Sequence, residues 1–232
     1  SWTETTNVNS ARRILSGSGT STSSLIYGGY TSGNTGLTES WNGSAWTEVA
    51  DLNLARYGLS GAGVSNTSGL AIGGSSPNTA DTESYNGSSW TEVANLNTSR
   101  GGTNAVGSQT AALVAGGNDP PYTAVTESWN GSAWTEVGDL NTARSIGAGG
   151  TQTSAVAFGG SVGGSNSALT ESWNGSAWSE DGDLNTARNG IQGSGSSNTS
   201  ALAATGYTSA PSAATEEWTG AGAAVTKTIT TS

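Results

Sequence analysis

The side chains of this 232-residue sequence that could do chemistry are its 17 carboxylates and 7 cations, because the sequence contains no Cys, His or Met. This composition excludes disulfides, thiolate or imidazole metal sites, and every nucleophile paired with a histidine base. Two kinds of carboxylate chemistry remain. Paired Asp and Glu side chains can hydrolyse glycosides, and clustered ones can bind calcium.

The regular spacing of the carboxylates argues against both. Ten of the 17 lie at two repeated positions, which are Glu39, Glu83, Glu127, Glu171 and Glu216, and then Glu4, Glu48, Glu92, Glu136 and Glu180. A catalytic pair must be asymmetric, with one acid protonated and the other ionised. The stretch 181–185 is similar to half of a calcium loop but lacks the required Gly and Glu. We therefore predict no enzymatic activity, no metal site and no cofactor.

The cations follow the same spacing. Five of the six arginines recur in register, namely Arg12, Arg56, Arg100, Arg144 and Arg188, whereas Arg13 lies outside it. A guanidinium beside repeated carboxylates is typical of a structural ion pair or of a clamp on backbone carbonyls. We interpret these five arginines as structural.

All of these side chains belong to a repeat that fills nearly the whole chain. The motif TESWNGSAWTEVADLNLAR begins at Thr38, and close copies begin at Thr82, Thr126 and Thr170, so the period is 44 residues. An eroded copy begins at Thr215. The chain opens with the back half of a unit, because Trp2 lies 44 residues before Trp46.

Each unit has the pattern of four strands. A stretch of small residues is followed by a polar turn, an apolar run that ends in paired glycines, a loop of variable length, and two short strands joined by Asn-Gly. Asn-Gly favours a two-residue type I′ hairpin turn, which would place Trp41 opposite Ser44 and diagonal to Trp46. No segment has the helical period.

Such units cannot bury both faces alone, so we predict that they pack radially. The predicted fold is all-β, a five-bladed β-propeller of four-stranded antiparallel blades, closed by the N-terminal strand. One domain, 1–232, contains units 13–56, 57–100, 101–144, 145–188 and 189–223, the last completed by 1–12, and a tail 224–232. Side-chain types alternate along the tail as they do in a strand. The tail either adds an edge strand or pairs with a neighbouring subunit.

The order Arg, glycine pair, aromatic residue, Trp resembles the kelch repeat, a propeller unit. The outer-strand tryptophans of this pattern are Trp2, Trp46, Trp90, Trp134 and Trp178. The strings WNGSAWTEV and NTAR are also similar to kelch-like repeats in predicted structural proteins of marine bacteriophages. The first resemblance implies a propeller whose N-terminal strand closes the last blade, and the second implies a place on a virion.

Two features of this sequence could recognise a ligand. The tryptophans either pack between blades or stack on sugars, and we favour packing. The loops between the second and third strands vary in length and emerge on one face, which is typical of a binding module. The candidate ligand-binding residues in them are Tyr30, Asn34, Asn118, Asp119, Tyr122, Asn166 and Tyr207.

We therefore expect a non-enzymatic structural or adhesion module, associated with a virion, that presents one loop face to a glycan or protein surface and contacts other virion subunits. The formal charge of −10 disfavours nucleic acid and anionic membranes, and no apolar run could insert into a membrane. The expected location is extracellular or on a virion surface. The alternatives are a secreted or surface lectin with repeated weak sugar sites, and a glycosidase.

Overall fold

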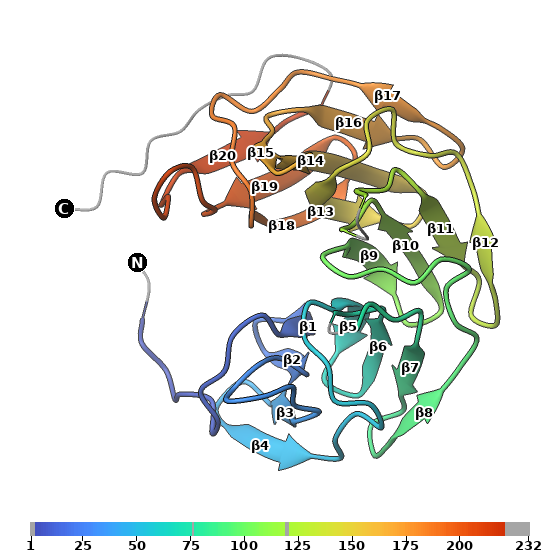
Figure 1. The fold of residues 1–232 in the computed structure, drawn as a ribbon. Helices are drawn as coiled ribbons and strands as arrows, with labels where there is room; N and C mark the ends of the chain where they lie inside the picture. Colours follow the sequence, from blue (N-terminus) through green and yellow to red (C-terminus); the bar gives the residue numbers. More distant parts are fainter. Residues whose placement is uncertain (1–2, 76, 119–120, 221–232) are drawn as a thin grey trace.

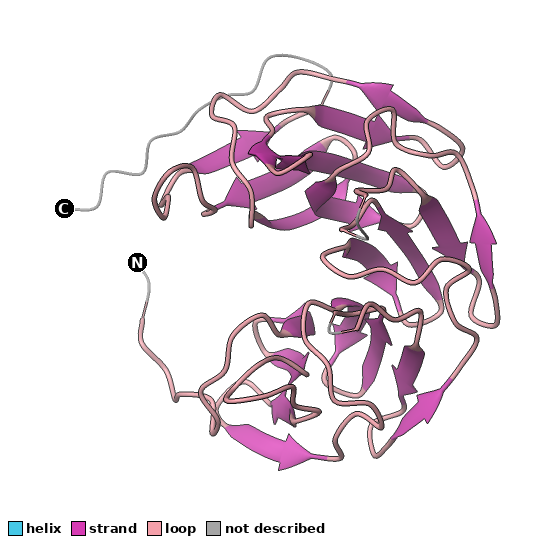
Figure 2. Ribbon diagram, in the orientation of Figure 1, coloured by secondary structure: helices cyan, strands magenta, loops and turns pink. Residues whose placement is uncertain are grey.

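The computed structural model describes residues 3–75, 77–118 and 121–220. These residues form strands and loops and contain no helix (Figure 2). The strands lie in five antiparallel sheets arranged around a common axis like the blades of a propeller (Figure 1). The predicted all-β propeller fold is confirmed.

The strands follow one another in chain order within each blade. Blade one contains β1 (Ser16–Thr20), β2 (Ser23–Tyr27), β3 (Thr38–Trp41) and β4 (Trp46–Val49). Blade two contains β5 (Ser60–Ser65), β6 (Ser68–Ile72), β7 (Thr82–Tyr85) and β8 (Trp90–Glu92). Blade three contains β9 (Asn104–Ser108), β10 (Ala111–Ala115), β11 (Thr126–Trp129) and β12 (Trp134–Glu136).

Blade four contains β13 (Ser145–Thr151), β14 (Ser154–Val162), β16 (Thr170–Trp173) and β17 (Trp178–Glu180), and the short β15 (Ser165–Asn166) pairs with β14. In the described part of the chain, blade five has three strands, β18 (Gln192–Ser197), β19 (Ser200–Ala204) and β20 (Thr215–Trp218). In every blade the first strand lies nearest the axis, and an opening separates blade five from blade one (Figure 1).

The predicted closure falls partly outside the described residues. Trp2 and the tail 224–232 are not described, and residues 3–8 are not part of a strand. The N-terminal segment runs along blade one at the opening (Figure 1), where Thr6 donates a hydrogen bond to Ser44 and Asn9 donates one to Glu39. The five blades are therefore present, and the pairing that would join the last to the first is not seen.

The outer hairpins of blades one to four differ from the prediction. Trp41 pairs directly with Trp46, so four residues rather than two connect β3 to β4. The Asn42 side-chain oxygen accepts hydrogen bonds from the backbone N–H groups of Ser44 and Ala45, both at 3.0 Å. The expected two-residue turn, with Trp41 opposite Ser44, was wrong because this asparagine acts through its side chain, as in an Asx turn.

Three of the outer-strand tryptophans, Trp90, Trp134 and Trp178, pack between blades, as predicted. Trp90 of blade two is 5% exposed and lies in an apolar cluster with Leu25 and Tyr27 of blade one. Its indole N–H donates to the Thr38 hydroxyl of blade one at 3.1 Å. The same bond joins Trp134 to Thr82 and Trp178 to Thr126. Each of these indoles therefore locks its own blade to the preceding one.

A buried arginine–glutamate pair marks each blade, as the spacing predicted. Arg56 forms an ion pair with Glu83, and its Nε donates to the carbonyl of Gly73 at 2.8 Å. The second carboxylate oxygen of Glu83 accepts from the backbone N–H of Asn53 at 2.7 Å. The other ion pairs are Arg12–Glu39, Arg100–Glu127, Arg144–Glu171 and Arg188–Glu216. Each glutamate of one blade therefore fixes the chain segment that arrives from the blade or segment before it.

The local environment shifts the pKa of several of these groups. Burial by itself would raise the pKa of Glu39, but hydrogen bonds from Arg12 and from the Asn9 and Ser10 amides outweigh it and hold the pKa below the usual value. The pKa of Glu216 is lowered in the same way by Arg188 and Asn185, against desolvation. Burial lowers the pKa of Arg100, and Glu127 opposes that effect.

Removing one member of such a pair leaves an uncompensated buried charge. We expect Arg144→Ala to lower the free energy of unfolding by about 3–5 kcal/mol, measured by urea titration at pH 7. The control is Arg13→Ala, which removes an exposed cation 5.3 Å from the Tyr30 ring centre and is expected to cost about 1 kcal/mol or less. An equal loss of unfolding free energy in both variants would show that the buried pair contributes no more to stability than an exposed cation does.

The lowered pKa of Glu39 predicts a pH dependence. A carboxylate with a depressed folded-state pKa contributes its full stability above the unfolded value of about 4.3, and loses it as the pH falls through the folded pKa. Glu39→Gln should therefore be less stable than the wild type at pH 7, and the difference should shrink as the pH falls below the unfolded value. Urea midpoints measured from pH 7 to pH 3 test this. A difference that stays constant over that range would contradict it.

Candidate functional site at the mouth of the hub

The inner strands approach one another so closely that they require small residues. A Cβ atom at Gly193 of β18 would lie 2.2 Å from the Ala148 carbonyl oxygen of β13. At Gly149 it would lie 2.8 Å from the Ser194 carbonyl oxygen. These strands, rich in Gly, Ala and Ser, therefore pack around the propeller axis and form its hub.

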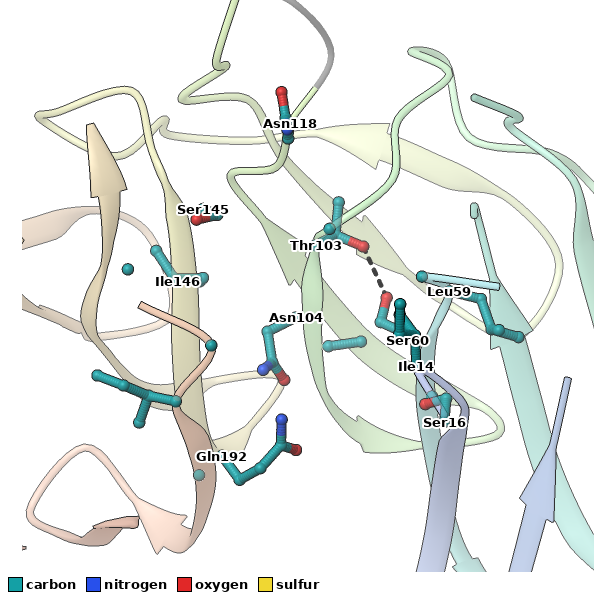
Figure 3. Close-up of a pocket in the computed structure, with 18 of the residues that line it drawn as sticks. Ile14, Ser16, Leu59, Ser60, Thr103, Asn104, Asn118, Ser145, Ile146 and Gln192 are labelled. Atoms are coloured by element: carbon teal, nitrogen blue, oxygen red, sulfur yellow. Dashed lines mark hydrogen bonds between the residues drawn. The ribbon is translucent and has the colours of Figure 1, made fainter. Parts of the chain in front are cut away.

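One end of the hub widens into a pocket of about 480 Å³, and every blade contributes to its wall. This volume lies within the usual range for small-ligand sites, about 300–1,000 Å³. The wall includes Asn118, the first residue of a variable loop, so the pocket opens on the loop face. Figure 3 shows the side chains around it.

The pocket wall is polar and uncharged. Asn104 of β9 and Gln192 of β18 project their amide groups toward the same part of the pocket from different blades (Figure 3). Ser60 and Thr103 also lie in the wall, and their hydroxyls are hydrogen-bonded at 2.8 Å. None of the described lining residues is Asp, Glu, Lys or Arg. The pocket therefore offers hydrogen-bond donors and acceptors without a net charge.

Ile14 at the pocket wall has a strained backbone. Its φ is 55°, a left-handed value that is unusual for a β-branched residue, and its side chain is 53% exposed. Gly58, Gly102 and Gly190 occupy the same repeat position, with φ values of 59–62°. Blade one therefore carries an apolar side chain at the mouth where three other blades have glycine, and such strain often accompanies function.

Four of the seven predicted loop residues, Tyr30, Tyr122, Asn166 and Tyr207, contact a neighbouring blade. The Tyr122 hydroxyl and the Ser161 hydroxyl of the next blade are hydrogen-bonded at 3.1 Å. The Asn166 amide donates to the carbonyls of Tyr207 and Thr208, at 3.1 and 2.8 Å. Tyr30 packs edge-to-face on Tyr57 of blade two, with ring centres 5.6 Å apart.

The remaining loop predictions have different outcomes. Asn34 forms a backbone bridge with Tyr30 inside its own loop. Asn118 is the only one of the described candidates that lines the pocket. Asp119 lies outside the described residues.

Sequence reasoning missed the inner-strand residues of the pocket. Ser16, Ser60, Asn104 and Gln192 each lie four positions after a repeated arginine. Blades three and five carry an amide side chain at this position, whereas the other blades carry Ser or Ala. These two amides, in strands made mostly of small residues, are the signal that could have identified the hub mouth.

The structure holds few groups for other chemistry. Among residues 3–75, 77–118 and 121–220, no cluster of acidic side chains could hold a metal ion. No helix in this part of the chain is long and apolar enough to cross a membrane. Glu48, Glu92, Glu136 and Glu180, which form the second repeated acidic position, are exposed.

Comparisons with known proteins support the fold alone. No family model matches the chain, and no curated protein matches it. Among solved structures, the one described as "Structure of YjhT" has a TM-score of 0.72 and 13% sequence identity, over 87% of this chain and 75% of that chain. At this identity the likeness shows that the two chains share a propeller architecture.

Proposed function

We propose that this protein is a non-enzymatic binding module whose hub mouth takes a neutral, hydroxyl-rich ligand, a glycan, while the surrounding loops contact the surface that carries it. The observation that supports this most is the uncharged pocket, with amides and hydroxyls supplied by several blades. Neutral sugars present hydroxyls that both donate and accept, which matches amide and hydroxyl groups. A binding site carried on a rigid propeller suits an adhesion or structural role.

The loops support a preformed recognition face. Hydrogen bonds between loops of adjacent blades, such as Tyr122 to Ser161, hold neighbouring loops together. A ligand that meets ordered groups loses less conformational entropy on both sides. The loop contacts therefore favour recognition by a rigid face.

The carboxylates give no support to a glycosidase. Glycoside hydrolysis needs two carboxyl groups facing one bond, at a separation of about 5–10 Å. The glutamates of the inner repeated position are held in buried ion pairs with arginines. The described wall of the pocket has no carboxylate. Non-enzymatic binding therefore fits the arrangement best.

The burial of the aromatic residues also favours one axial site over repeated sugar sites. Trp129 and Trp173 are each 1% exposed, so their ring faces are not available for stacking. Trp134 and Trp178 are 6% and 7% exposed. A lectin with equivalent sites on every blade would need these rings at the surface.

The place on a virion rests on a resemblance drawn from the sequence alone. The strings WNGSAWTEV and NTAR resemble kelch-like repeats in predicted structural proteins of marine bacteriophages. A virion protein that presents a sugar-binding face would attach the particle to a host surface. We propose this setting for the module, with a cell surface or the extracellular space as the alternative.

A glycan array read for both binding and hydrolysis tests the proposal. Asn104→Ala and Gln192→Ala should each weaken binding about tenfold, because each removes about one hydrogen bond to a desolvated ligand. Ser88→Ala, in an exposed turn of blade two, is the matched control and should bind like the wild type. Hydrolysis of any glycan, or binding that is unchanged in both amide variants, would overturn the proposal.

The strain at Ile14 predicts that replacing this residue with glycine maintains or raises stability but lowers glycan affinity. A left-handed non-glycine residue costs about 1–2 kcal/mol, and glycine costs about 0.5–1 kcal/mol in chain entropy. Ile14→Gly should therefore unfold at equal or higher urea concentration while its glycan affinity falls.

The control for Ile14→Gly is Thr205→Gly. Thr205 has a φ of 61° and does not line the pocket, so this change should raise stability and leave binding intact. If Ile14→Gly binds as well as the wild type, Ile14 has no part in recognition.

A further inference from the structure

Five backbone bridges, one in each blade, lie around the hub mouth. In each bridge the residue directly after the repeated arginine pairs with the residue that follows the glycine pair, or follows Thr205-Gly206 in blade five. Two of these residues, Asn118 and Ser145, line the pocket. The equivalent positions of every blade therefore lie at the edge of the pocket, and we call them the mouth ring. The bridges are Arg13–Tyr30, Tyr57–Ser75, Gly101–Asn118, Ser145–Ser161 and Asn189–Tyr207.

The mouth ring contains one charged side chain, Arg13, and no carboxylate. One set of repeated glutamates is held in buried ion pairs away from this edge. Four members of the other set lie on the outer strands β4, β8, β12 and β17, at the rim of the propeller (Figure 1). The edge of the pocket is therefore positive in a protein whose formal charge is −10.

Arg13 also differs from the other arginines in having no anionic partner. Each of the other five arginines forms a buried ion pair with a glutamate. Arg13 is exposed, and its guanidinium forms no ion pair with the described residues; its interaction there is with the Tyr30 ring. The N–H donors of this guanidinium are therefore available to a ligand.

Two tyrosines hold the Arg13 side chain in place. Arg13 and Tyr30 exchange backbone hydrogen bonds of 3.1 and 2.8 Å, and the guanidinium carbon lies 5.3 Å from the centre of the Tyr30 ring. The Tyr30 ring in turn packs edge-to-face on Tyr57 of blade two. A cation–π contact attracts the charge without using an N–H donor. The cation is thus positioned before a ligand arrives, which reduces the entropy lost on binding.

The backbone connects this cation directly to the pocket. Arg13 precedes Ile14, which lines the pocket wall and whose carbonyl accepts a hydrogen bond from the Gly58 N–H of blade two at 3.0 Å. The described wall itself has no charged side chain. A sugar seated in the pocket would therefore meet neutral groups, and a group on the neighbouring sugar of the same glycan would meet Arg13.

The chemistry of the two neighbouring places differs. The amides of Asn104 and Gln192 in the pocket suit sugar hydroxyls, because each amide both donates and accepts. The planar guanidinium of Arg13 donates two parallel hydrogen bonds to an oxyanion such as a carboxylate. A sulfate ester presents the same kind of oxygen atoms. A glycan that joins a neutral sugar to a uronic acid or a sulfated sugar would fit both places.

We propose that Arg13 forms a second subsite, which binds the carboxylate or sulfate group of a sugar next to the neutral sugar held in the hub mouth. This inference rests on the proposed glycan-binding function and narrows its ligand to an acidic glycan. The net negative charge of the protein opposes such a ligand at long range, and salt screens that repulsion over about 8 Å at physiological ionic strength. Selectivity for the acidic glycan therefore depends on the short-range contact with Arg13.

Oligosaccharide pairs that differ only in charge test the proposal. Oligogalacturonate is compared with its methyl ester, and a sulfated galactan oligosaccharide with its desulfated form, by isothermal titration calorimetry. The wild type should bind the charged member of one pair about tenfold more tightly, as expected for one hydrogen-bonded ion contact. The pair that shows this preference identifies the recognised group as a carboxylate or a sulfate.

Variants assign the preference to Arg13. Arg13→Gln should abolish it and leave the affinity for the neutral member unchanged, whereas Arg13→Lys should keep part of it, because an ammonium group lacks the planar fork. The matched control is Ser88→Asp, which makes the net charge more negative by the same one unit in an exposed outer turn and should keep the full preference. Asn104→Ala should weaken both members equally, since it acts in the pocket.

Three results would overturn the Arg13 subsite. The first is equal binding of the charged and neutral members by the wild type. The second is a preference that survives in Arg13→Gln. The third is an equal loss of preference in Ser88→Asp, which would assign it to the long-range field. If Asn104→Ala weakens binding in any of these cases, the proposed function stands without this subsite. No binding of any of the four oligosaccharides would overturn both proposals.

A second measurement needs no oligosaccharide. In protein with isotopically labelled arginine, sodium sulfate or sodium glucuronate should shift the Nε–H nuclear magnetic resonance signal of Arg13, which is identified by its loss in Arg13→Gln. The signals of the five paired arginines should change less, because their guanidinium groups are buried. An Arg13 signal that responds to neither anion would overturn the proposal.

Discussion

The buried bridge between an arginine and the glutamate of the sheet it enters is the interaction on which this structure depends. A buried pair of charges is stable only if its remaining hydrogen-bonding groups are satisfied. The glutamate therefore also binds the backbone of an asparagine three positions before the arginine, as Glu83 does with Asn53. The indole-to-threonine bond near the rim adds a second fixed point, as between Trp90 and Thr38. The ion pair and the indole-to-threonine bond lie at different distances from the propeller axis, and together they fix the orientation of one blade relative to the next.

Features that recur in every unit could be predicted from the sequence. The period of 44 residues, the count of units and the role of the arginines follow from residue types at fixed spacing. The turn after Trp41 could not be read from Asn-Gly alone, because an asparagine can satisfy a turn by its side chain or by its backbone. Here the Asn42 side chain caps two N–H groups and lengthens the loop to four residues.

The site was harder to predict for a physical reason. Loop residues such as Tyr122 and Asn166 vary as binding residues do, but their polar groups are used between loops. The hub mouth is formed by side chains that are more than 80 residues apart in sequence, as Asn104 and Gln192 are. Only the ring brings them together. Their spacing after the repeated arginines becomes informative once the inner strands are known to share an axis.

Every blade junction in the described chain is maintained by contacts between immediate neighbours, and no bond reaches across to a third blade at the rim. A stretch of coding sequence that copies or deletes one whole unit would therefore leave both flanking junctions chemically complete. Near-identical tandem stretches invite misaligned recombination between gene copies. A single duplication or deletion of one unit would then convert one propeller into another with a different number of blades and a different combination of residues at the hub mouth.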